Sequence, residues 1–119
     1  MEIIINSYNG KNIAEIVSDE VLIKNTQDAL DIMAECTYRD SWKIIIHEKN
    51  IIADFFDLKT KLAGDILQKF STYNVQLSII GDFSKYTSKS LKDFIFESNK
   101  YGRISFVSSI EGGKVRLMK

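Results

Sequence analysis

The chain has 119 residues, a length typical of one domain, and its 16 basic and 16 acidic residues cancel. A neutral balance argues against general nucleic-acid binding, because that requires an excess of positive charge against the phosphates. No apolar run approaches the roughly 20 residues that span a membrane, and the N-terminus lacks the pattern of a signal peptide. The single cysteine, Cys36, has no partner for an internal disulfide. We therefore expect a cytoplasmic protein that has no contact with membranes or nucleic acid.

Residues 2–17 are predicted to form a β-hairpin. Its turn is Asn9-Gly10, the strongest short hairpin signal, because both central positions of a type I′ turn need positive φ. The two-residue loop pairs Tyr8 with Lys11 and places four apolar side chains on one face. They are Ile3, Ile5, Ala14 and Ile16.

A linker over residues 18–24 precedes a first helix that Asn25 or Thr26 is expected to cap. Its apolar residues recur at i, i+3, i+4 and i+7, which is the pattern of a core-facing helix. They are Ala29, Ile32, Met33 and Cys36. Cys36 is therefore predicted to be a core residue rather than a nucleophile. Residues 42–47 predict a strand, and their unbroken run of three isoleucines suits a parallel strand covered on both faces.

Residues 57–73 predict a long amphipathic helix. Its core-facing stripe consists of apolar residues four apart, namely Leu58, Leu62, Ile66 and Phe70. Asp54 or Asp57 is expected to cap the start of this helix, since a short carboxylate accepts hydrogen bonds from free backbone N–H groups. Asn74 is expected to end it in the left-handed conformation.

Residues 75–80 predict a buried strand that Gly81-Asp82 terminates. A polar loop then leads into a helix that starts near Ser88 or Ser90 and stops at Gly102.

Residues 103–107 predict the last strand. The tail 109–119 fits either a closing helix or a short extended piece. Gly112-Gly113 weakens a helix by about 1 kcal/mol per glycine, and Val115 and Leu117 alternate as in a strand.

The order of elements predicts a single α/β domain over residues 1–119. Alternating strands and helices imply a mixed, mostly parallel sheet of five strands with right-handed crossovers. The opening hairpin adds an antiparallel edge, and about three to four helices pack on the sheet.

Several segments carry a resemblance to a known family. The runs FFDLKT, LAG, ILQKF, GDFSKYTSKSL, DFI and ESN, within about residues 25–110, resemble the bacterial family named domain of unknown function 4180. The order of elements is also similar to the STAS domain of anti-sigma-factor antagonists. These resemblances imply a STAS-like fold and a bacterial cytoplasmic setting, and the family implies no known activity.

Ligands of open α/β sheets bind beyond the carboxyl ends of the parallel strands. At these ends we expect a rim of polar residues, which we call the carboxyl rim. Its candidate ligand-binding or partner-binding residues are His47, Glu48, Asp82, Ser84, Lys85 and Ser88. His47 is either a general base oriented by Glu48 or Asp82, or a strand-end histidine bonded to the backbone. We favour the second reading, because residues 47 and 48 point to opposite faces of a strand.

The loop before Ser88 has two readings as well. It is either an anion site at a helix N-terminus or a capped, solvated helix start, and the second is favoured because the glycines of a phosphate loop are missing. By similarity to STAS regulators, Thr60 is a candidate regulatory phosphosite. The expected aspartate-serine pair reads Asp57-Leu58, however, so a plain surface threonine is the favoured reading.

The sequence contains no catalytic signature, and one histidine with one distant cysteine gives no metal-ligand spacing. We therefore expect no metal, no cofactor and a non-catalytic binding or regulatory module. A protein partner fits this reading. The alternative is a small enzyme or anionic-ligand binder that uses His47, Glu48 and Asp82. A homo-oligomer is a third hypothesis, for which Phe96 and Tyr86 are candidate contacts.

Overall fold

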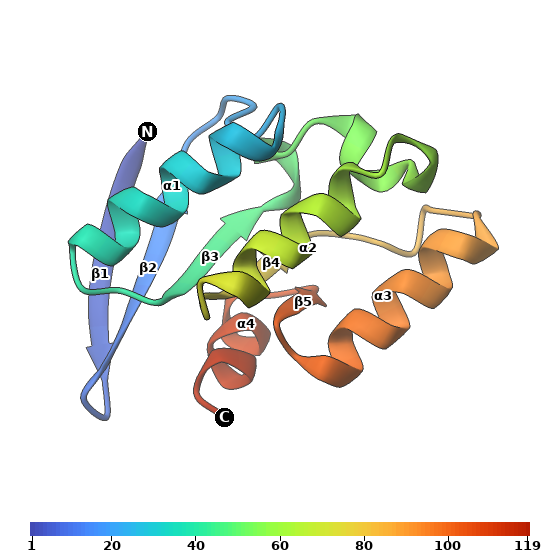
Figure 1. Cartoon of the computed structure of the whole chain (residues 1–119). Helices are drawn as coiled ribbons and strands as arrows, with labels where there is room; N and C mark the ends of the chain where they lie inside the picture. The colour runs from blue at the N-terminus through green and yellow to red at the C-terminus, as the bar shows by residue number, and fades with distance from the viewer.

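The computed structural model describes all 119 residues. Five strands form one sheet in the order β1-β2-β3-β4-β5, with β1 antiparallel to β2 and the other neighbours parallel. Their bounds are β1 Glu2–Tyr8, β2 Lys11–Val17, β3 Lys43–His47, β4 Gln76–Ile80 and β5 Ile104–Val107. The helices are α1 Thr26–Tyr38, α2 Leu62–Thr72, α3 Lys89–Tyr101 and α4 Ile110–Leu117. The predicted single α/β domain with a mixed sheet is thus confirmed (Figure 1). None of the helices combines the length and the apolar character that crossing a membrane requires.

The hairpin has the predicted turn and register. Asn9 and Gly10 have φ values of 52° and 80°, and Tyr8 pairs with Lys11. Further along, Ile3 pairs with Ile16 and Ile5 with Ala14, so the four predicted apolar side chains share one face.

The sheet separates two hydrophobic layers. Ile44 and Ile46 of β3 belong to the large cluster that α1, α2 and α3 cover, whereas Ile45 points to a smaller cluster with Leu117 of α4. All three isoleucines are fully buried, which confirms a parallel strand covered on both faces. Cys36 lies in the large cluster with the rest of the α1 stripe, as predicted.

The start of the central helix differs from the prediction. The helix α2 begins at Leu62 rather than at residue 57, and neither predicted aspartate caps it, because Lys61 is its N-cap in a left-handed conformation (φ 66°). Three short 3₁₀ turns occupy the preceding segment: η1 Glu48–Asn50, η2 Ala53–Phe56 and η3 Leu58–Thr60. The Thr60 hydroxyl lies 2.7 Å from the Asp54 carbonyl oxygen and 2.9 Å from that of Asp57. Such local bonds compete with helix formation.

The stripe of α2 is consequently shorter than predicted. Ile66 and Phe70 are fully buried, but Leu62 is only partly buried and Leu58 lies outside the helix. Asn74 follows the helix with φ 58°, as expected for a left-handed stop.

The tail is helical. Ser109 caps α4 by accepting a hydrogen bond from the Gly112 N–H at 3.0 Å. Gly113 lies directly on the sheet, where an added Cβ would come within 3.0 Å of Ile80 Cδ1 and 3.3 Å of Ser78 Cβ. The glycine therefore permits close packing, which offsets its low helix propensity.

Candidate binding surfaces

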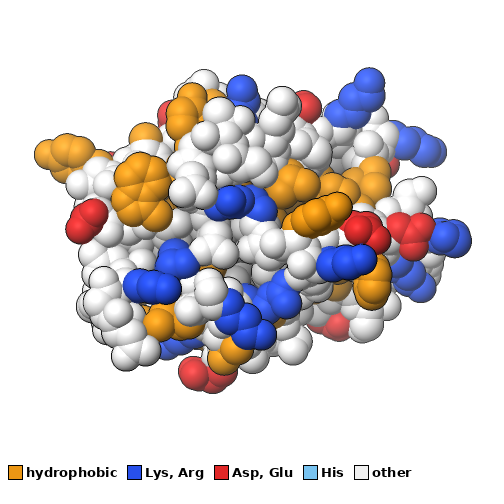
Figure 2. Space-filling model, turned by 60° about the horizontal axis from the view of Figure 1, so that its bottom comes forward, with side chains coloured by type: hydrophobic (Ala, Val, Ile, Leu, Met, Phe, Trp, Pro, Cys, Tyr) orange, Lys and Arg blue, Asp and Glu red, His pale blue; other side chains and the backbone are white.

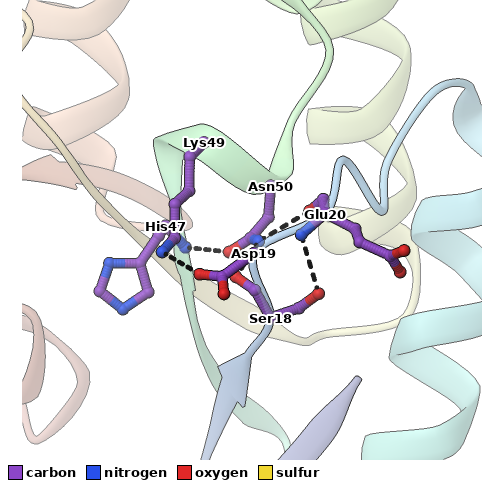
Figure 3. Close-up of polar contacts among 6 residues, drawn as sticks. All are labelled: Ser18, Asp19, Glu20, His47, Lys49 and Asn50. Carbon is purple, nitrogen blue, oxygen red and sulfur yellow. Dashed lines mark hydrogen bonds and ion pairs between the residues drawn. The ribbon is translucent and has the colours of Figure 1, made fainter.

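The first part of the carboxyl rim is a structural corner built on Asn50. This residue is fully buried, and its Nδ2 donates hydrogen bonds to the carbonyl oxygens of Ser18 and Glu20, both at 2.9 Å. Its Oδ1 accepts from the backbone N–H of His47 at 3.3 Å. The amide thus joins the chain after β2 to the end of β3 (Figure 3), while the imidazole of His47 is turned away from this group. An ion pair between Lys49 and Asp19 at 3.0 Å spans the same corner.

The second part of the rim is a cluster around Glu48, whose side chain is only 14% exposed. Its Oε2 accepts a hydrogen bond from the Tyr86 hydroxyl at 2.5 Å and lies 2.8 Å from Lys85 Nζ. The Tyr86 ring stacks on Phe56 with centroids 5.1 Å apart. Burial, followed by the hydrogen bond and the charge of Glu48, raises the pKa of Tyr86 well above its usual value. A shallow pocket of about 260 Å³ adjoins this cluster.

The remaining predicted rim residues bond within their own loop. Asp82 accepts hydrogen bonds from the Ser84 N–H at 3.1 Å and the Ser84 hydroxyl at 2.6 Å, and these bonds lower the pKa of Asp82. Ser88 caps α3 by accepting from the Leu91 N–H at 3.3 Å. The structure therefore brings Glu48 and Lys85 together with Tyr86, and it leaves His47, Asp82, Ser84 and Ser88 outside that cluster.

The positions of Thr60 and Cys36 favour structural roles for both side chains. Thr60 is exposed, and its hydroxyl holds the turn before α2. Cys36 is fully buried, and burial raises the pKa of its thiol to about 11. A protonated, inaccessible thiol is a poor nucleophile.

The opposite edge of the sheet carries a surface that the sequence reasoning missed. Each of α1, α2 and α3 ends beside the amino end of the next strand, and an exposed tyrosine is the last residue of the helix or follows it directly. The three tyrosines are Tyr38, Tyr73 and Tyr101, and Trp42 lies with them at this edge. The exposed fractions of the four residues lie between 50% and 89%. Of the exposed aromatic residues, only Phe96 lies elsewhere. We call this region the amino-edge surface.

Positive charge accumulates on the same surface. Its basic residues come from the starts of β2, β3 and β5 and from the ends of α3 and α4; they are Lys11, Lys43, Lys100, Arg103, Arg116 and Lys119. None of them takes part in any of the ion pairs of the structure. Figure 2 shows Lys and Arg side chains spread over the middle of this side of the molecule among hydrophobic ones.

Lys43, one of these cations, is half-buried. Its Nζ donates a hydrogen bond to Gln76 Oε1 at 2.5 Å. Burial, and then the charges of Lys11 and Arg103, lower the pKa of Lys43. The ammonium group forms no ion pair with a carboxylate, and two further cations act on it.

Two grooves open towards the amino-edge surface on either side of α2. The groove between α1 and the end of α2 has a volume of about 400 Å³, and its lining includes Leu30, Met33 and Ala34 of α1 together with Trp42 and Tyr73. The groove between α2 and α3 has a volume of about 420 Å³ and is bordered by Tyr101 and Arg103.

Fold and surfaces together define a small α/β domain with an internally bonded carboxyl rim and an aromatic, basic amino edge. The chain belongs to the family described as Domain of unknown function (DUF4180), whose model matches residues 8–117. The predicted resemblance to this family is confirmed, and it extends further than expected, into the hairpin and through α4. Comparison with curated proteins and with solved structures found no match.

Proposed function

We propose that this protein is a non-catalytic binding module that engages a partner protein through the amino-edge surface. The observation that supports this is the gathering of Tyr38, Trp42, Tyr73 and Tyr101 at one end of the molecule, beside cations that have no carboxylate partner. Tyr, Trp and Arg are the residue types most enriched among side chains that dominate protein–protein interfaces. Isolated exposed aromatics are ordinary, but a group of four on one surface favours an interface.

A regulatory role remains part of this proposal. It rests on the order of elements, which is similar to that of STAS regulators, and on the bacterial cytoplasmic setting that the family resemblance implies. A second copy of this chain that docks on Phe96 of α3, whose side chain is 68% exposed, is a competing hypothesis.

A ligand site at Glu48 is the second candidate function. The observation that favours it is the nearly buried carboxylate beside the pocket of about 260 Å³. The charge of Glu48 is already matched by Lys85 and by the Tyr86 hydroxyl, so an incoming anion would have to displace Glu48 from Lys85. Because of this competition, we rank the carboxyl rim below the amino edge as a candidate binding surface.

Affinity capture from the cells that make this protein separates the two candidates. Trp42→Ala with Tyr73→Ala removes two half-exposed aromatics from the amino edge, while Asp82→Ala with Lys85→Ala alters the carboxyl rim. Phe96→Ala is the matched control for loss of an exposed aromatic. We expect the first variant alone to lose a partner that the wild type recovers, with an unchanged melting temperature. Loss of that partner from the carboxyl-rim variant alone would refute the proposal.

A further inference from the structure

From the charges and grooves of the amino edge, we infer that this surface takes an acidic segment of a partner protein, with one apolar side chain of that segment seated between α1 and α2. This inference rests on the proposed function and specifies the chemistry of the partner.

One positive charge of the amino edge has no carboxylate partner. Lys43 Nζ is bonded to the neutral amide of Gln76, and the charges of Lys11 and Arg103 act on it with the same sign. Elsewhere in this molecule lysines pair with carboxylates, as Lys49 does with Asp19 and Lys89 with Asp93. A partner carboxylate placed among Lys11, Lys43 and Arg103 would replace mutual repulsion by attraction. The structure thus presents three cations that a partner could complete into an ion-pair network.

An apolar groove lies next to these cations. Trp42 lines the groove between α1 and α2, and it also lines a smaller hollow of about 230 Å³ that contains Lys11 and Lys43. Trp42 therefore lies between the apolar groove and the positively charged hollow. The groove volume of about 400 Å³ is enough for one large side chain of a partner. An anchor in a pocket with charged groups around it is the usual design of a protein interface.

Negative groups at this edge favour an acidic peptide over a nucleic acid as the partner. The carboxyl ends of α1, α2 and α3 all lie at this edge, and helix carboxyl ends repel negative charge. Asp31 lines the first groove, Glu97 the second, and Asp40 the small hollow. A continuous polyanion would meet these groups, whereas a peptide can place its few carboxylates only where cations lie. The net charge of zero points the same way.

Selection from a displayed library of random short peptides tests this inference on the intact chain. We expect the enriched peptides to combine Asp or Glu with one apolar residue. Synthetic copies without tryptophan are then titrated, and the emission of Trp42, the only tryptophan of the chain, reports binding at the groove. Lys11→Gln with Lys43→Gln is expected to weaken binding about tenfold. The matched control, Lys59→Gln with Lys92→Gln, changes two exposed lysines outside this surface and is expected to bind as the wild type does.

The salt dependence of wild-type binding tests the same claim without any substitution. Affinity is expected to fall as salt rises from about 0.1 M to about 1 M, where the screening length drops from about 10 Å to about 3 Å. Enriched peptides without an acidic excess, no enrichment at all, or equal binding by the lysine variants would overturn the inference. So would a single-stranded oligonucleotide that binds as tightly as the best peptide. In each case, loss of the captured partner from the Trp42→Ala and Tyr73→Ala variant would leave the proposed function standing.

Discussion

Replacing Asn50 by aspartate keeps the shape of the side chain but removes the two N–H donors that join the rim. The carbonyl oxygens of Ser18 and Glu20, each 2.9 Å from Nδ2, would then face a carboxylate oxygen. An unsatisfied buried carbonyl costs about 1–3 kcal/mol, so two cost about 2–6 kcal/mol. Because Glu20 is exposed and water reaches this part of the chain, we expect a loss of about 2–4 kcal/mol in the free energy of unfolding. The bond from the His47 N–H can persist.

Asn25→Asp is the matched control, since it makes the same chemical change at the N-cap of α1. There the side chain only accepts a hydrogen bond, from the Asp28 N–H at 2.8 Å, and Asn and Asp cap helices equally well. Urea unfolding followed by circular dichroism measures both variants. The loss at Asn50 should shrink at acidic pH, where a protonated carboxyl group can donate one hydrogen bond. A loss below about 1 kcal/mol, or one equal to that of the control, would refute the structural role of Asn50.

Further predictions concern two glycines, Tyr86 and Cys36. Gly81→Ala should lower the free energy of unfolding, measured in urea, by about 1–3 kcal/mol, because the new Cβ would lie 2.5 Å from Glu48 Oε1 and 2.7 Å from Glu48 Cβ. Gly64→Ala should instead raise it by about 0.5–1 kcal/mol, because the space around the new Cβ is open. The pKa of Tyr86 is raised above its ordinary value of 10.0, so its contribution to stability is fully present below pH 10 and is lost as the pH rises through the folded pKa. Tyr86→Phe should abolish that part of the alkaline loss, and identical alkaline slopes for the two proteins would contradict it. Since burial raises the pKa of the Cys36 thiol to about 11, a thiol reagent at neutral pH should modify Cys36 only at the rate at which the chain unfolds, and fast labelling of the native protein would disprove its burial.

The elements that could be predicted from the sequence are those that local patterns determine. Asn9-Gly10 specifies its own turn and thereby the hairpin register. The spacing of apolar residues identifies the buried face of α1, since only one face of a helix can meet the sheet.

The start of α2 was predicted wrongly, and the form of the tail was left open. Apolar periodicity continued back to Leu58, but the bonds of Thr60 to two carbonyl groups favoured a separate turn. At the tail, Gly113 weakens a helix in isolation and yet lets α4 approach Ile80, a benefit that exists only after folding.

The amino-edge surface was missed because the prediction considered only the carboxyl ends of the strands. Tyr38, Tyr73 and Tyr101 are far apart in the chain, and the parallel topology brings them to one edge. The available signal was an aromatic residue at the end of each predicted helix. Glu48 and Lys85 were both predicted at the carboxyl rim, and the structure pairs them, but the sequence does not show that Asp82 and Ser84 bond to each other.

Site-specific photo-cross-linking tests the central claim most directly. A photoreactive phenylalanine analogue replaces Tyr73 at the amino edge, Phe96 on α3 or Thr87, which lies in the loop before α3 next to the rim residue Ser88. All three positions are exposed, and the experiment is done in the cells that make the protein. We predict a discrete covalent adduct with one partner protein from position 73 and none from the other two. An adduct from position 87 or 96 in the absence of one from position 73 would contradict binding through the amino edge.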